Sequence, residues 1–293
     1  METSYRANVG KGATIELFGN ITTVRNRLVS LAPGVQEFAS GDYRTAVGFP
    51  IGYFYGYKTL GIYQNTAQAD AAILDISNGR NKPVPGDVIF EDNNGPGTDG
   101  QQFSGTPDGQ INVEDRTYLG KTIPDFFYGF GVNANWKGFD LNMLFQGVAG
   151  ISVYNQFRRG GENLGGVGRN NLASTANRWT GEGTSNTMPR ATANDRNGNG
   201  RFSDRWIEDA SFLRFKNVQL GYSIPRVMLD KIKVFQGARV YVAATNLFRI
   251  TKYSGLDPEV VTYGQPSSQL FAGSDAGNIP QPVTVQLGAN LTF

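Results

Sequence analysis

The sequence predicts an all-β fold, the antiparallel portion of a transmembrane β-barrel with about 8–10 strands and long extracellular loops, spanning residues 1–293 as one domain. Two observations predict this fold. Several segments alternate apolar and polar residues over about twice the length of an ordinary strand. The connections between these segments are either very short or very long, as is typical of outer-membrane barrels.

The clearest strand is the C-terminal segment 283–293, VTVQLGANLTF. Its odd-numbered residues are apolar and its even-numbered residues are Thr, Gln, Gly, Asn and Thr, so the two kinds lie on opposite faces of a strand. The segment is longer than a usual strand of about 5–6 residues. It matches the length of a tilted transmembrane strand, which is about 9–11 residues.

A second pattern predicts a long hairpin. Residues 126–136 place aromatic and aliphatic side chains at even positions and mainly Gly and Asn at odd positions, and a Lys-Gly pair at 137–138 supplies the turn. The return strand begins at Phe139, and its polar face is interrupted once, by Leu144. Trp136 and Phe139 flank the turn, as expected for an interfacial aromatic girdle.

Shorter alternating segments at 13–22, 218–224 and 240–244 predict further strands, and 226–231 predicts one short helix. No other segment sustains a helical period, and no run approaches the roughly 18 apolar residues of a transmembrane helix. The first residues lack the basic and apolar regions of a signal peptide, so we expect none in this sequence.

A soluble β-sandwich would also show alternation, so this pattern alone does not distinguish the two folds. The length of the strands, the lack of charge on the apolar face of the clearest strands, and a Gly, Asn, Thr and Gln face suited to a lumen favour the membrane. The long connections, at about 65–117 and 155–205, are polar and rich in Gly and Asn. We expect them to be surface loops on one side of the barrel.

The composition excludes several functions. The chain has no Cys and no His, so it holds no thiol nucleophile, Ser-His-Asp triad, His-anchored zinc or disulfide. A formal net charge of +2 gives no reason to expect a nucleic-acid partner. Gly accounts for 38 of 293 residues, well above the usual share of roughly 7%, which indicates many turns or close backbone approaches. We predict that the protein is not an enzyme.

Two weak motifs do not change this prediction. Residues 120–122, Gly-Lys-Thr, resemble the end of a phosphate-binding loop, but Asp115 stands where the first Gly should be and Ile-Pro follows in place of a helix. The adjacent Glu208 and Asp209 would face opposite sides of a strand, so they do not form a glycosidase pair.

Two loops resemble calcium-binding loops, because oxygen-bearing side chains recur at alternate positions around a Gly. The candidate ligands are Ser104, Thr106, Asp108, Asn112 and Asp115 in one loop, and Asp195, Asn197, Asn199 and Asp204 (or Glu208 in place of the last) in the other. Tight turns select the same residue types, so a turn cluster without metal is the alternative. Calcium is therefore a candidate ligand, and no other cofactor is predicted.

Several longer motifs occur in a consistent order along nearly the whole chain. They are GFPIGYFYGY (48–57), PGD (85–87), DGQI (108–111) with DR (115–116), GFDL (138–141) with FQGVAG (145–150), RWT (178–180), SDRWIEDASFLRFKNVQLGY (203–222), NLF (246–248), YSGLDPE (253–259) and LTF (291–293). Together they resemble the C-terminal part of the SusC/RagA-like TonB-dependent outer-membrane transporters.

This resemblance implies part of a 22-stranded barrel that imports glycan oligosaccharides or peptides across the outer membrane of a Gram-negative bacterium. It also implies partners: outer-membrane lipid, a SusD-like surface lipoprotein, and TonB, engaged through an N-terminal part with a plug that residues 1–293 do not contain. One departure is local. The acidic loop of the family usually runs unbroken, whereas here residues 96–107 separate 92–95 from Asp108.

The resemblance assigns the terminal Phe293 as the sorting signal that the barrel-assembly machinery reads. Aromatic residues of the long loops are candidates for stacking on a sugar. They are Tyr154, Phe157, Trp179 and Trp206, with Tyr63 and Phe103 as further members. The alternative function is a soluble, secreted β-protein that binds calcium or carbohydrate.

Overall fold

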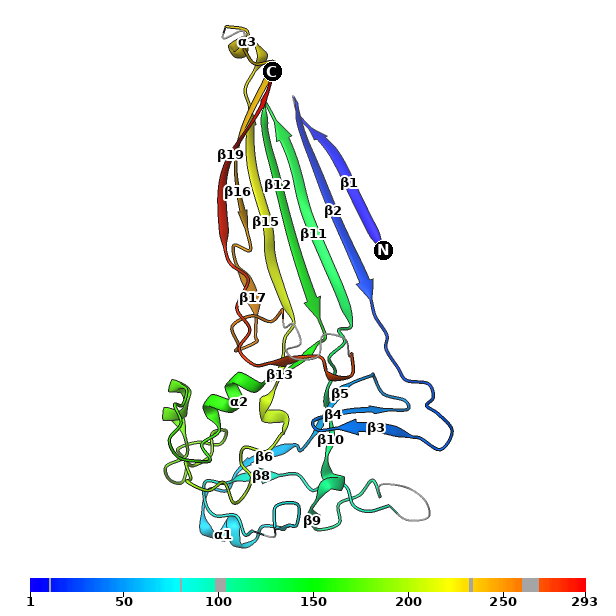
Figure 1. The fold of residues 1–293 in the computed structure, drawn as a ribbon, viewed down its shortest axis with the longest axis vertical. Helices are drawn as coiled ribbons and strands as arrows, with labels where there is room; N and C mark the ends of the chain where they lie inside the picture. The colour runs from blue at the N-terminus through cyan, green and yellow to red at the C-terminus, as the bar shows by residue number, and fades with distance from the viewer. Residues whose placement is uncertain (11, 80, 98–103, 232–233, 260–268) are drawn as a thin grey trace.

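The computed structural model describes residues 1–10, 12–79, 81–97, 104–231, 234–259 and 269–293. A long sheet forms one part of the molecule, and a lobe of short elements lies at one end of it (Figure 1). The long strands of the sheet are, in spatial order, β1 (Glu2–Val9), β2 (Ala13–Thr23), β11 (Phe126–Trp136), β12 (Phe139–Ala149), β15 (Phe212–Ser223), β16 (Gly237–Thr245) and β19 (Thr284–Thr292). The short β17 (Arg249–Thr251) pairs with β15. All these pairings are antiparallel, and the eight strands of this sheet agree with the predicted all-β barrel portion.

The alternating segments of the sequence are the long strands of this sheet. β11 covers the whole of the predicted 126–136, and β12 continues the return strand to Ala149. Between them Lys137 and Gly138 have φ angles of 47° and 89°. Two successive positive φ values define the tight hairpin turn that matches the twist of the strands, and Gly adopts the second without strain.

Two kinds of element are absent from the sequence predictions. β1 alternates only weakly, because Thr3 and Ala7, which share a face with Tyr5, are not strongly apolar, yet β1 pairs with β2 along its whole length. Helices α1 (Thr66–Asp70) and α2 (Gln156–Glu162) are too short to show a helical period, while α3 (Arg226–Leu229) lies within the predicted 226–231. Among the described residues, no helix has the length and apolar character needed to cross a membrane.

The loop lobe, which we define as the described parts of 24–125, 150–211 and 252–283, is built from short strands. They are β3 (Glu37–Ser40), β4 (Tyr43–Ala46), β5 (Tyr53–Gly56), β6 (Thr59–Ile62), β7 (Leu74–Asp75), β8 (Val88–Phe90), β9 (Gln110–Ile111), β10 (Thr117–Gly120), β13 (Ser152–Asn155), β14 (Ile207–Asp209) and β18 (Ser274–Asp275). Four short 3₁₀ helices accompany them: η1 (Val113–Asp115), η2 (Ala173–Asn177), η3 (Asp204–Trp206) and η4 (Gln269–Phe271).

The lobe has its own hydrophobic core. Phe54, Tyr154, Phe202 and Trp206 pack together, and a second cluster contains Val88, Phe90 and Ile111. The long connections therefore lie at one end of the sheet, as predicted, whereas the turn at 137–138 and helix α3 lie at the other (Figure 1). These long connections are not irregular loops, because they contain short strands and a hydrophobic core of their own.

Candidate functional site

The register of the long strands gathers apolar residues on one face of the sheet. One row runs from Tyr5 through Leu17, Val132, Met143, Val218 and Ala244 to Val285, each residue opposite the next. In β15 the register shifts by one residue at Lys216, so Phe215 and Leu213 continue this face beyond Val218. Every residue that the register places on this face in the seven long strands is uncharged. The alternation predicts that this face meets lipid, and we call it the apolar face.

Large side chains of the apolar face are exposed rather than packed against protein. Leu17 is 50% exposed and Leu287 is 86% exposed. Across the middle of the face, the rings of Phe130 and Phe145 stack at 5.0 Å, and those of Phe145 and Phe215 stack at 4.4 Å. A surface this large and this apolar is stable only when another apolar phase covers it.

The opposite face of the sheet, the polar face, carries a ladder of hydrogen bonds across four strands. The amide of Asn133 donates to Glu16 Oε2 at 3.2 Å, the amide of Asn142 donates to Asn133 Oδ1 at 2.5 Å, and the amide of Asn217 donates to Asn142 Oδ1 at 3.0 Å. The ladder joins β2, β11, β12 and β15 through side chains as well as backbone. Such a face suits a wet interior.

An ion pair on the polar face explains one of the strand glycines. Arg239 of β16 donates two hydrogen bonds to Asp140 of β12, and the pair crosses over Gly221 of the intervening β15. A Cβ at Gly221 would lie 2.5 Å from Asp140 Oδ1, so a side chain there would displace the ion pair. Part of the Gly excess therefore makes room for polar contacts across strands.

In the lobe, a network of charges fixes helix α2. Arg158 contacts the carboxylates of Glu162 at 2.8 Å and Glu208 at 3.0 Å, and Ser254 donates to Glu208 through its backbone and its hydroxyl, each at 2.8 Å. Burial raises the pKa of Glu208, but the hydrogen bonds from Ser254 and Arg158 outweigh burial and lower it below its ordinary value. Burial, reinforced by the nearby Arg158, lowers the pKa of Arg205 to about 10.

The structure separates the aromatic residues that the sequence proposed for stacking. Trp206 is fully buried and Tyr154 is 5% exposed, both in the lobe core, so these two predictions are corrected: their rings are covered by protein. Trp179 is partly buried and donates from Nε1 to Gln64 Oε1 at 3.3 Å. Phe157 is 49% exposed. Tyr63 is buried, and Phe103 lies outside the described residues.

The first calcium-like loop is joined in space despite the intervening residues 96–107. Asp92 accepts hydrogen bonds from the N–H groups of Asp108 and Gly109, at 3.2 and 2.8 Å. The fully buried carboxylate of Asp115 accepts the N–H groups of Asn93, Asn94 and Asn112. The remaining candidate ligands also have internal partners: Ser104 donates to the Thr106 carbonyl, and the Asn112 amide donates to Asp108.

The second calcium-like loop likewise uses its oxygens within the protein. Asp195 accepts the N–H groups of Asn199 and Gly200, at 2.7 and 2.8 Å. Asn197 donates to the Val88 carbonyl, Asn199 accepts the Val88 N–H, and Asp204 accepts two hydrogen bonds from Thr59. Within the described part of the chain, no group of three or more His, Cys, Asp or Glu is arranged to hold a metal ion. Calcium binding stays a prediction.

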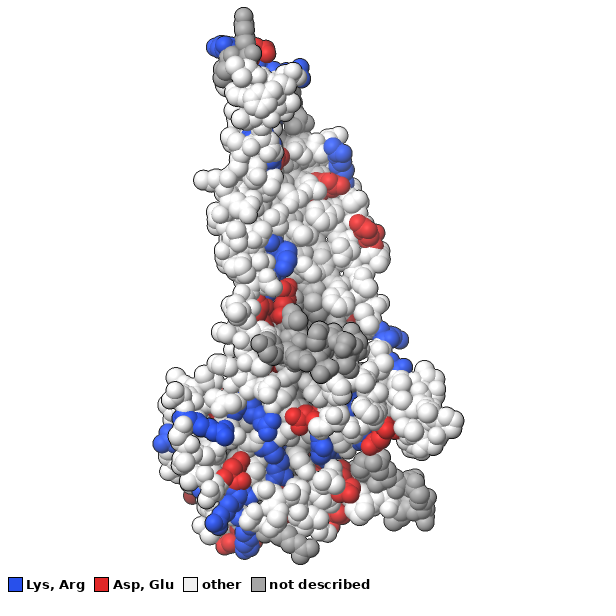
Figure 2. All heavy atoms as spheres, in the orientation of Figure 1, with Lys and Arg blue, Asp and Glu red and all other residues white. Residues whose placement is uncertain are grey.

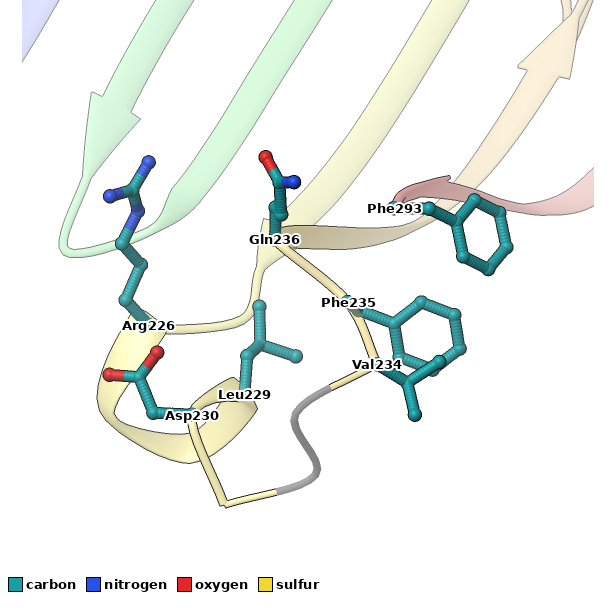
Figure 3. Close-up of a pocket in the computed structure, with 7 residues that line it drawn as sticks. All are labelled: Arg226, Leu229, Asp230, Val234, Phe235, Gln236 and Phe293. Atoms are coloured by element: carbon teal, nitrogen blue, oxygen red, sulfur yellow. The ribbon is translucent and has the colours of Figure 1, made fainter.

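The terminal Phe293 lies at the end of the sheet opposite the lobe. Phe293 is 73% exposed, and its ring lies 5.2 Å from the ring of Phe235 in the connection between β15 and β16, which also carries Leu229 and Val234 (Figure 3). A cavity of about 480 Å³ opens between these side chains and Arg226. The contact holds the end of β19 against its neighbour but leaves much of the ring accessible.

Comparison with known proteins identifies relatives along the whole chain. The TonB-dependent receptor P3 of Formosa agariphila is 31% identical over 288 residues, which are 94% of this chain and 26% of the receptor. The TonB-dependent receptor SusC of Bacteroides thetaiotaomicron is 30% identical over 300 residues, which are 100% of this chain and 26% of SusC. The chain thus spans about a quarter of the length of these relatives. No protein-family model matches it.

The fold also matches solved structures of the RagAB peptide importer. The structure of the RagAB peptide importer in the closed-closed state superposes with a TM-score of 0.76 and 24% identity, covering 100% of this chain and 29% of the matched chain. Its open-open state gives a TM-score of 0.74 at 23% identity. The sequence relatives and the shared fold confirm the resemblance to SusC/RagA-like TonB-dependent transporters.

Proposed function

From this resemblance we propose that the chain is the C-terminal barrel portion of a TonB-dependent transporter in the outer membrane of a Gram-negative bacterium, and that the transporter imports nutrient fragments. The observation that carries the proposal is the apolar face, uncharged across seven strands. Such a face is expected to lie in lipid, and in water it would aggregate. It argues against the alternative of a soluble, secreted β-protein.

In this proposal the chain performs no covalent chemistry. The polar face lines the interior of the barrel, and the loop lobe faces outward, toward the substrate and a SusD-like lipoprotein. On the face drawn in Figure 2, charged side chains are more numerous on the lobe than on the sheet, which suits a wet recognition surface at one end of a membrane wall. TonB would act through a part of the transporter outside residues 1–293. The cargo is a glycan oligosaccharide or a peptide.

The proposal is tested on the polypeptide at its full encoded length. We expect the protein in the outer-membrane fraction, folded only with lipid or detergent, and we expect deletion of its gene to abolish growth on at least one class of oligosaccharide or peptide. Growth should return with the intact gene but not in a strain that lacks TonB. Recovery of the protein as a soluble monomer would favour the secreted alternative.

Phe293 is proposed as the sorting signal, because its ring remains accessible at the end of the last strand. Deleting Phe293 should reduce the amount of folded barrel in the outer membrane, measured by its heat-dependent mobility on gels. The variant Phe235→Ala is the control, since it removes the ring contact of Phe293 and leaves the terminal residue in place. Normal assembly without Phe293 would exclude this role.

Calcium binding in the two loops is proposed on the sequence pattern alone. It predicts heat on calorimetric titration with calcium and a lower melting temperature in chelator. Asp108→Asn and Asp195→Asn would separate the contributions of the two loops. Absence of both effects in the unaltered protein would exclude calcium.

A further inference from the structure

Helix α2 buries charged side chains and exposes its apolar one, which is the reverse of the usual arrangement in a surface helix. Arg158 and Glu162 lie one turn apart and direct their charges into the buried network, where the side chain of Glu162 is 6% exposed. Phe157, Gly160 and Gly161 share the other side of the helix, and the Phe157 side chain is 49% exposed. A surface helix normally buries its apolar residue and exposes its charges.

The two glycines on that side differ in what they do. A Cβ at Gly161 would lie 2.6 Å from Leu172 Cγ, so packing requires Gly there. A Cβ at Gly160 would meet no described atom within 4 Å, and Gly160 is not among the glycines with positive φ. Gly inside a helix costs about 1 kcal/mol relative to Ala. Neither packing nor backbone conformation accounts for Gly160, and its effect is to leave space open.

That space is a cavity of about 450 Å³. Phe157, Leu172 and the glycines of helix α2 line it, together with the amide-bearing residues Gln156, Asn170 and Asn171. The described residues that line it carry no charge. The Phe157 ring is held in place, because Gly277 packs beside it and the Ser274 hydroxyl donates to the neighbouring Gln156 at 3.2 Å.

We propose that this cavity is a subsite for one ring of a neutral oligosaccharide, stacked on Phe157 while Asn170 and Asn171 bond its hydroxyls. A sugar ring offers an apolar C–H face and a rim of hydroxyls, and an amide both donates and accepts hydrogen bonds. The volume lies within the range of about 300–1,000 Å³ that is usual for ligand pockets. The uncharged lining offers no partner to a charged ligand, which disfavours the charged ends of a short peptide.

This inference rests on the proposed transport function and narrows its cargo. The test uses the full-length protein purified in detergent, titrated by calorimetry with three neutral hexasaccharides: maltohexaose, cellohexaose and xylohexaose. We expect at least one of them to bind. Gly160→Leu adds a side chain on the cavity side, at a position where a Cβ would meet no described atom within 4 Å, and it should weaken that binding about tenfold or more. Phe157→Ala should weaken it about tenfold.

The matched control is Gly181→Leu, because Gly181 lies in the same lobe and a Cβ there also meets no atom within 4 Å. It should leave affinity unchanged. Gly160→Ala tests folding separately: it should raise the melting temperature, because Ala is the better helix former. The proposal is overturned if Gly160→Leu binds as tightly as the unaltered protein, or if no hexasaccharide binds. Transport can persist in either case, so the proposed function would fail only if the gene deletion has no effect on growth.

Discussion

The long sheet and the loop lobe differ in which side chains they expose and which they bury. In the sheet, charge is absent from one entire face, and large residues such as Leu287 stay exposed. In the lobe, polar groups are buried: among the described residues, every buried charged or polar side chain except Arg214 belongs to the lobe. If the proposed function holds, the sheet depends on lipid for its apolar burial, whereas the lobe depends on its own core and on internal ion pairs.

This difference teaches where each region is vulnerable. In the proposed barrel, the effect of a substitution in the sheet on stability depends on whether the new side chain meets lipid or the lumen. The effect of a substitution in the lobe on stability depends on how the new side chain packs against the surrounding protein atoms. Substitutions in the two regions should consequently respond to different environments, and the following variants, all in the full-length protein, test that separation.

The largest effect is expected in the lobe core, for Trp206→Ala. Trp206 is fully buried against Phe54 and Phe202, and its Nε1 donates to the Arg201 carbonyl at 3.0 Å. Loss of the ring should destabilise the lobe by about 3–5 kcal/mol. Limited proteolysis should then cleave the lobe while the sheet keeps its heat-dependent gel mobility. Phe157→Ala, at an exposed ring, is the control; equal protease resistance of both variants would contradict a self-supporting lobe.

The next effect is expected on the apolar face, for Leu287→Arg. Near the middle of the membrane, Arg on the lipid side of a barrel strand costs about 2–4 kcal/mol. Its neighbour Gln286 lies on the polar face of the same strand, so Gln286→Arg should have little effect. Unfolding by denaturant from lipid vesicles measures both. If the two variants lost equal stability, the assignment of the faces would be wrong.

The sheet was largely predictable from the sequence because its chemistry is periodic. Each strand of 126–136, 139–149 and 284–292 places every second residue on the apolar face, so its pattern can be recognised in each strand independently of the others. β1 was not predicted, since Thr3 and Ala7 weaken its pattern and its pairing with β2 defines it as a strand.

The candidate sites were less predictable, because they depend on contacts distant in sequence. Trp206 and Tyr154 looked like ligand-stacking residues in a loop, but they pack with Phe54, which lies 100 or more residues earlier. Asp204 stays a predicted metal ligand, and its hydrogen bonds from Thr59, 145 residues earlier, could not be foreseen from the loop sequence. Composition reveals which residue types a loop contains and says nothing of their partners. Among the predicted aromatic residues that the structure describes, Phe157 alone is well exposed, as its predicted role requires.

A smaller effect is expected on the polar face, for Asn142→Ala. This change removes the central rung of the ladder, including the bonds to Asn133 and Asn217. Each hydrogen bond contributes about 0.5–1.5 kcal/mol, and water in the lumen replaces part of it, so we expect a loss of about 1 kcal/mol. Asn135→Ala is the control, because Asn135 is exposed on the same face of β11. Equal losses in denaturant unfolding would show that the ladder adds nothing.

The smallest effect is confined to acid and belongs to the lobe. The pKa of Glu208 in the folded protein lies below its ordinary value of 4.5, because Ser254 and Arg158 stabilise the carboxylate. A carboxyl with a lowered folded pKa contributes stability that is present above pH 4.5 and is lost as the pH falls through the folded pKa. The melting temperature of the lobe, followed by tryptophan fluorescence, should therefore fall below pH 4.5, and Glu208→Gln should flatten that part of the curve. The apolar face of the sheet should not contribute to this dependence, since the residues that the register places on it include no carboxyl group. An identical acid transition in Glu208→Gln would mean that other carboxyls, and not the pairing of helix α2 with β14, control the response of the lobe to pH.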